Sequence, residues 1–292
     1  MFSGSLVAIV TPMHANGGLD FKAWSRLIDF HIENGTSGIV VGGTTGESAT
    51  LSNAELVELT QRACEQIRGR IQVITGAGSS DTAATVERVQ ALSRLPLDGV
   101  LIVTPAYNRP TQEGLFRHYE AAAAASRVPV IAYNVPSRTA VDMLPATVAR
   151  IAQLPRLAAV KEAVAQVSRV REILALVPAG FVVLSGDDAS ACETVLAGAR
   201  GVISVTANVV PRMMADMIAA ALRGDAAGAR KLDEGLASLH ETLFLETNPI
   251  PAKWALARMG LMSAHVRLPL TELAPQFEPA LERSLREAGA VR

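Results

Sequence analysis

The chain has 292 residues, 49% of them hydrophobic, which is enough to bury a large core and excludes a fully disordered protein. Its 27 basic and 28 acidic side chains leave a formal net charge of -1, so no net field would attract nucleic acid or an anionic membrane. A small molecule or a second copy of the chain is therefore the expected partner.

Eight short runs of β-favouring apolar residues follow one another along the chain. The runs are unbroken rather than alternating, which is typical of parallel strands covered by helices on both faces. They begin roughly 20 to 35 residues apart, the length of one βα unit, and eight such units close into a barrel. An open doubly wound sheet is the alternative, but it would normally use fewer strands. The runs are 6–10, 38–41, 71–75, 100–103, 128–133, 157–161, 181–185 and 201–205.

Segments with a 3.6-residue period lie between these runs and carry helix start signals. Ser52 followed by Glu55 is a capping box, and Asp81 precedes a second helical segment. After residue 224 the strand-like runs stop, and helices are predicted over 225–244, 251–260 and 271–288. The fold class is therefore α/β, a (β/α)8 TIM barrel at 1–224 that carries the catalytic site, with a C-terminal helical domain at 225–292.

Two features bear on the cellular compartment. The first residues show no basic segment followed by a long apolar one, and no stretch approaches the ~18 apolar residues needed to span a bilayer. Cys64 and Cys192 fall in helix-like patterns, where buried reduced thiols are commoner than a disulfide. We expect a cytoplasmic protein.

Lys161 is the most informative residue, because it closes the sixth apolar run. Reactive groups of such barrels lie at the carboxyl ends of the strands. An amine carried into an apolar barrel mouth loses part of its basicity, and a neutral amine attacks carbonyl groups to form an imine. A lysine that extends to solvent is the alternative, but the polar residues that end the other runs favour the reactive one.

Several of these polar residues have the chemistry that an imine-forming lysine needs. Tyr133 ends the fifth run and could transfer protons if Thr44 and Tyr107 hold its hydroxyl, although a core tyrosine is the commoner case. The loop around Thr45 could bind a carboxylate through its amides, and Arg138 has a planar fork suited to a second carboxylate.

Metal chemistry is not indicated. The five histidines show no metal-ligand spacing, and the pair Asp187-Asp188 is expected to cap the next helix rather than to bind a metal.

These motifs together resemble the 4-hydroxy-tetrahydrodipicolinate synthase family, also called dihydrodipicolinate synthases. The likeness covers nearly the whole chain and includes segments of the C-terminal helical region. It is carried by Gly43-Thr44-Thr45-Gly46-Glu47-Ser48, Thr104-Pro105-Ala106-Tyr107-Asn108, Tyr133-Asn134-Val135-Pro136-Ser137-Arg138, Lys161-Glu162-Ala163, Ser185-Gly186-Asp187-Asp188, Gly201-Val202-Ile203-Ser204 and Asn248-Pro249-Ile250-Pro251.

The resemblance implies a lyase that condenses pyruvate with L-aspartate 4-semialdehyde in lysine and diaminopimelate biosynthesis, with no cofactor beyond the covalent imine. Lys161 would form the Schiff base, with Tyr133 as general acid and base and Thr44 and Tyr107 completing a proton relay. Thr45, Gly186 and the backbone of Ile203 would contact substrate, and Arg138 would bind the carboxylate of the semialdehyde. Tyr107 would come from the adjoining subunit of a tight dimer, and two dimers would form a homotetramer.

The chain departs from the family pattern in two places. Val164 and Ala165 stand where the family often has threonine and glycine, which would change the contacts behind the lysine. Members that L-lysine inhibits carry histidine, asparagine, glutamate and tyrosine at four positions that differ here, so we expect weak or absent inhibition. These positions are Leu56, Ser80, Ala84 and Ala106.

Two other functions fit the same barrel. Another pyruvate-type class I aldolase, such as an N-acetylneuraminate lyase or a keto-sugar-acid aldolase, would keep Lys161 and Tyr133 but generally lack the arginine at position 138. A catalytically silent sensor or binding barrel would not need every reactive position, and here all of them are present.

Overall fold

Eight parallel strands close into a barrel in the computed structural model of the chain, which describes residues 2–291. Each strand pairs with the next one in the chain, and β8 pairs with β1 to close the ring. The eight predicted runs are all strands, with ends displaced by at most two residues. The strands are β1 (Gly4–Ala8), β2 (Gly38–Val41), β3 (Gln72–Gly76), β4 (Gly99–Val103), β5 (Val130–Asn134), β6 (Leu157–Glu162), β7 (Val182–Ser185) and β8 (Gly201–Ser204).

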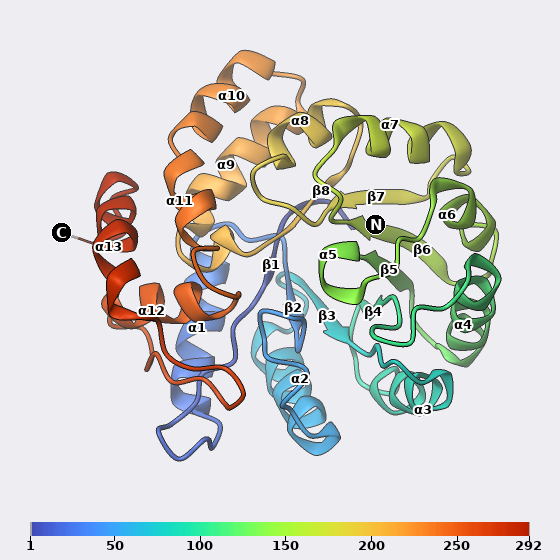
Figure 1. Cartoon of the computed structure of the whole chain (residues 1–292), viewed down its shortest axis with the longest axis horizontal. Coiled ribbons are helices and arrows are strands. Elements are labelled where there is room, and N and C mark those ends of the chain that lie inside the picture. The colour runs from blue at the N-terminus through green and yellow to red at the C-terminus, as the bar shows by residue number, and fades with distance from the viewer. Residues whose placement is uncertain (1, 292) are drawn as a thin grey trace.

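Helices connect successive strands and cover the outside of the barrel (Figure 1). The predicted start signals are confirmed: Ser52 and Glu55 form a reciprocal capping box, and Asp81 accepts hydrogen bonds from two amides of the next helix. The helices of this part are α1 (Phe21–Glu33), α2 (Asn53–Ile67), α3 (Thr82–Leu92), α4 (Gln112–Ala125), α5 (Pro136–Thr139), α6 (Pro145–Ile151), α7 (Val167–Leu176), α8 (Ala191–Leu196) and α9 (Pro211–Leu222), with the 3-10 turn η1 (Thr206–Asn208).

The buried apolar side chains form two cores, one inside the barrel and one between the strands and the helices. Successive residues of a strand point to opposite faces, so each strand supplies both cores. In β6, Ala159 belongs to the inner core and Val160 to the outer one. Continuing that alternation, Lys161 points into the barrel and Glu162 points outward, toward the layer of helices.

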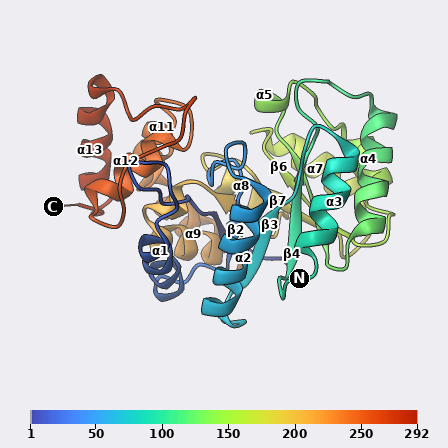
Figure 2. The same cartoon turned by 90° about the horizontal axis from the view of Figure 1, so that it is seen from below.

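Four helices follow the barrel within residues 2–291, and Figure 2 shows the last three of them to one side of it. They are α10 (Ala226–Glu234), α11 (Ala237–Thr242), α12 (Ile250–Arg258) and α13 (Glu278–Glu287), the last preceded by the 3-10 turn η2 (Pro275–Phe277). The first of them, α10, packs against α9, the last helix of the barrel. The division of the chain into domains at residue 224 stays a prediction.

Two of the predicted C-terminal helices were wrong in detail. The segment 225–244 is broken after α10, at Gly235, whose lack of a side chain makes it a poor helix former. The helix predicted over 271–288 begins later, because Pro275 holds Ala274 in an extended conformation, with ψ at 135°.

Both cysteines are buried free thiols, as predicted. Burial raises the pKa of Cys64 and of Cys192 to about 11. Within residues 2–291, the helices are all too short or too polar to cross a membrane.

Candidate active site

Lys161 lies at the carboxyl end of β6 with 5% of its surface exposed. Its ammonium group therefore loses most of its hydration, and this burial lowers the pKa of Lys161 from 10.5 to about 8. The negative charge of Asp188 raises this pKa and the positive charge of Arg138 lowers it, both less strongly than burial. Within residues 2–291 the amine makes no hydrogen bond or ion pair, so its lone pair is available once the proton leaves.

A cavity of about 330 Å³ opens above this amine at the carboxyl ends of the strands. Six of the eight predicted site residues line it. They are Thr44, Thr45, Tyr133, Arg138, Lys161 and Gly186.

Tyr133 stands beside Lys161, because the two residues are register partners on the adjacent strands β5 and β6. The amine of Lys161 lies 4.3 Å from the centroid of the Tyr133 ring. Burial raises the pKa of Tyr133 to about 12, while Arg138 and the hydroxyl of Thr44 act in the opposite direction. The phenol therefore carries its proton at neutral pH and can donate it.

Glycine at position 186 makes room for the lysine. A Cβ added there would lie 3.0 Å from Cε of Lys161 and 2.9 Å from Cβ of Ala163. Real Cβ contacts are rarely so short, so a side chain at this position would displace the reactive lysine.

The loop after β2 presents Thr44 and Thr45 to the cavity. Its amides at Gly46, Glu47 and Ser48 donate to carbonyl groups within the loop. The amides of Thr44 and Thr45, by contrast, have no acceptor among residues 2–291. Because both residues line the cavity, these two N–H groups are candidates to bind a carboxylate there.

Arg138 lies on α5, the short helix that follows β5 and begins at Pro136. Its side chain is exposed and lines the mouth of the cavity. This guanidinium is close enough to influence the pKa of both Lys161 and Tyr133. Arg138 therefore places a positive charge near the reacting groups.

Tyr107 and Ile203 do not line the cavity. Tyr107 follows β4 in a loop, with 94% of its surface exposed and a positive φ of 71°. Ile203 is buried in the inner core, and Val205 of the same segment lines the cavity instead. The proposed roles of both residues stay predictions.

The chain has no candidate metal centre within residues 2–291, where no group of three or more His, Cys, Asp or Glu side chains is placed to hold an ion.

Comparison with known proteins agrees with the chemistry of the cavity. A family model described as the dihydrodipicolinate synthetase family matches residues 1–288. The chain belongs to this family.

Relatives in this family match the chain from end to end. Two proteins named 4-hydroxy-tetrahydrodipicolinate synthase, from Ectopseudomonas mendocina (strain ymp) and from Methylococcus capsulatus (strain Bath), are 50% and 51% identical over 291 residues, which is 100% of each chain. The crystal structure of the chloride-inhibited dihydrodipicolinate synthase from Acinetobacter baumannii, complexed with pyruvate, superposes with a TM-score of 0.98 at 44% identity and full coverage of both chains.

The cavity is also lined by residues that the sequence did not reveal. Phe244, Thr247 and Asn248, from the connection between α11 and α12, line the cavity. Asn248 donates a hydrogen bond to the hydroxyl of Thr45 at 3.0 Å. The only sequence signal for this contact was the motif at Asn248-Pro249, whose place in the fold could not be inferred.

A second buried lysine supports the same loop. Lys253 of α12 is 0% exposed, and its amine donates to Glu47 at 2.6 Å and to the carbonyl of Thr11 at 2.9 Å. Arg267 donates its backbone N–H to the other oxygen of Glu47. Lys253 is therefore paired with a carboxylate and a carbonyl group, which distinguishes it from Lys161.

The prediction that the acidic pair caps the next helix was wrong, because α8 has no side-chain cap. Asp187 lies ahead of α8 and accepts from the amide and the hydroxyl of its N-cap residue, Ser190. Asp188 instead accepts from the amides of Val205 and Thr206, beyond β8. It turns away from α8 because those two free N–H groups follow the adjacent strand, and its charge acts on Lys161.

Proposed function

We propose that this protein condenses pyruvate with L-aspartate 4-semialdehyde to give 4-hydroxy-tetrahydrodipicolinate, a step of lysine and diaminopimelate biosynthesis. The observation that carries the proposal is Lys161, a buried and unpaired amine with a lowered pKa at the floor of a polar cavity. The names of the relatives support the choice of substrates.

The first step forms the imine. The neutral amine of Lys161 attacks the keto carbon of pyruvate and gives a carbinolamine, which loses its hydroxyl group as water. Tyr133, whose phenol is protonated at neutral pH, is placed to donate the proton that this water needs. Thr44 is the group that can pass a proton to the phenol, since its hydroxyl lies beside it. No cofactor is required for this chemistry.

The carboxylate of pyruvate would be bound by the free amides and hydroxyls of Thr44 and Thr45. Asn248 holds the Thr45 hydroxyl in place from the C-terminal helices. Gly186 leaves the space in which the imine forms, and the backbone of Ile203 is proposed as a further contact.

The second step makes the carbon–carbon bond. The phenolate that Tyr133 becomes in the first step takes a proton from the pyruvyl methyl group and converts the imine into an enamine. The enamine carbon attacks the aldehyde of the semialdehyde, and the reprotonated Tyr133 protonates the resulting alkoxide. The amino group of the semialdehyde then attacks the imine carbon, closes the ring and releases Lys161 as the free amine. Arg138 would bind the carboxylate of the semialdehyde through its guanidinium fork.

We also propose that Tyr107 enters the site of a second copy of the chain. The residue is 94% exposed in a loop with a positive φ of 71°, and such exposure of a large aromatic side chain suits a residue that completes a neighbouring site. A homotetramer of two tight dimers is the proposed assembly. The two buried free thiols support a reducing compartment, for which we propose the cytoplasm.

A coupled assay that follows both substrates tests the proposed function. The wild-type protein should consume pyruvate and semialdehyde in equal amounts, and Lys161→Ala should abolish this activity. Consumption of pyruvate with other aldehydes but not with the semialdehyde would contradict the assignment.

For the assembly, a mixture of inactive Lys161→Ala and weakened Tyr107→Phe chains should regain activity after subunit exchange, because one site of each mixed dimer then has both residues.

A further inference from the structure

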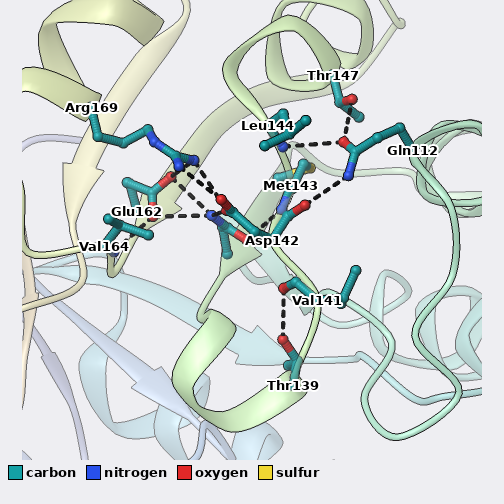
Figure 3. A network of polar contacts seen from close by, with 11 residues as sticks. Gln112, Thr139, Val141, Asp142, Met143, Leu144, Thr147, Glu162, Val164 and Arg169 are labelled. Atoms are coloured by element: carbon teal, nitrogen blue, oxygen red, sulfur yellow. Dashed lines mark hydrogen bonds and ion pairs between the residues drawn. The ribbon is translucent and has the colours of Figure 1, made fainter.

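We infer that Glu162 is a positioning residue, which together with Asn134 fixes Lys161 against Tyr133 from behind the barrel wall. The inference deepens the proposed function and rests on it. It concerns a cluster of buried polar groups that the chemistry above does not use (Figure 3).

The two strands carry two matched pairs of residues. On β5 and β6, Tyr133 is the register partner of Lys161, and Asn134 is the register partner of Glu162. The first pair faces the cavity and the second faces the helices, because neighbouring residues of a strand point to opposite faces. Whatever fixes the outer pair therefore fixes the backbone that carries the inner pair.

Side-chain hydrogen bonds join the outer pair directly. The amide of Asn134 donates to both carboxylate oxygens of Glu162 at 3.1 Å, and the backbone N–H of Val164 donates to one of them at 2.8 Å. Glu162 is 1% exposed and Asn134 is fully buried. Val164 is one of the residues that departs from the family pattern, yet the contact uses only its backbone.

The cluster continues to the segment that follows Arg138. Asn134 accepts from the backbone N–H of Met143 at 2.9 Å and donates to Asp142 at 2.8 Å. Asp142 in turn binds the guanidinium fork of Arg169, on α7, at 2.7 and 3.0 Å. Figure 3 shows the side chains of Glu162, Asp142 and Arg169 pointing toward one another.

A carboxylate is the group that these contacts require. Both oxygens of Glu162 accept from N–H groups, and Asn134 cannot turn its amide over without losing its bonds to Met143 and Asp142. Glutamine at position 162 would place an NH₂ group against the NH₂ group of Asn134. Burial raises the pKa of Glu162 to about 7, while the bonds from Val164 and Asn134 and the charge of Arg169 oppose that rise. The carboxylate that these contacts require is therefore the predominant form only above about pH 7.

The test is the rate of imine formation in Glu162→Gln, measured with saturating pyruvate by rapid quenching with borohydride and intact-protein mass. We expect a rate lower by ~10- to 100-fold, because small displacements of reacting groups cost that much. Half-saturation by pyruvate should change by less than about threefold, since the carboxylate-binding loop is untouched. The control is Thr60→Val, which removes the buried hydrogen bond between Thr60 and Thr75 behind β3, and it should keep the wild-type rate.

Glu162→Asp provides a second variant, because it keeps the charge but withdraws it from Asn134 by one methylene group. It should slow imine formation in the same way. A folded Glu162 variant that forms the imine within twofold of the wild-type rate would overturn the inference, as would an equal loss in Thr60→Val. If the wild-type protein itself forms no imine, the proposed function fails. If the wild type forms the imine and the Glu162 variants form it at the same rate, only the inference about Glu162 fails.

Discussion

The lowered pKa of Lys161 makes a quantitative prediction about the pH dependence of imine formation. With a pKa of about 8, roughly one amine in ten is neutral at pH 7, whereas the ordinary value of 10.5 would leave roughly one in 3,000. Burial of this side chain therefore increases the concentration of the reactive form ~300-fold at pH 7. The same shift means that burying the charged amine lowers the stability of the folded chain by about 3 kcal/mol, at ~1.4 kcal/mol for each tenfold change in proton affinity.

Rapid quenching with borohydride between pH 6 and 10 measures this dependence. The rate of imine formation should rise about tenfold per pH unit below pH 8 and level off above it. Arg138→Gln removes a cation that lowers the pKa, so its midpoint should move to higher pH. A wild-type midpoint near 10.5 would refute the reasoning, because the amine would then be hydrated.

The same shift fixes the sign of an effect on stability. Between pH 8 and 10.5 the unfolded chain binds the Lys161 proton more tightly than the native state does, so the contribution of this group to stability rises with pH across that window. Below pH 8 the full cost is present. Lys161→Met should remove it, and chemical denaturation at pH 7 should show a gain on the order of 3 kcal/mol, while a loss of stability would contradict the assigned burial cost.

Three further outcomes are expected of the wild-type site and its variants. Tyr133→Phe should reduce turnover by ~100-fold or more with the fold intact by circular dichroism, and a change of only a few-fold would mean that Tyr133 merely packs. Arg138→Ala should raise the KM for the semialdehyde far more than that for pyruvate, and equal effects would contradict its role. L-Lysine should inhibit weakly or not at all, because Leu56 is buried and the hydroxyl of Ser80 already donates to Ala106. The loss of two charge-assisted hydrogen bonds weakens lysine binding by roughly two to four orders of magnitude. Half-inhibition at submillimolar lysine would refute this prediction.

The parts that sequence could predict are those with a local cause. Unbroken apolar runs identified the eight strands, because a strand buried on both faces has no other composition. The position of Lys161 followed from the same pattern, since the residue that ends such a strand faces the barrel mouth. Six of the eight predicted site residues therefore line one cavity.

The parts that escaped prediction depend on contacts between distant segments. Lys253 sits in a helix with no pattern to mark its burial, and its partner Glu47 lies 206 positions away. The contacts of Asp188 with Val205 and Thr206 require the pairing of β7 and β8 to be known first. Asn134 and Glu162 face away from the site, so the sequence alone did not indicate a functional role for either residue.

The central claim is that one amine of this chain forms the imine, and the residue labelled by borohydride in the presence of pyruvate tests it most directly. Two lysines, Lys161 and Lys253, are buried, so burial alone does not choose between them. Lys253 is paired with Glu47, whereas Lys161 has no ion pair within residues 2–291, and peptide mapping should therefore find one reduced pyruvyl group per chain, on Lys161. A label on Lys253, or a label that persists in Lys161→Ala, would contradict the account.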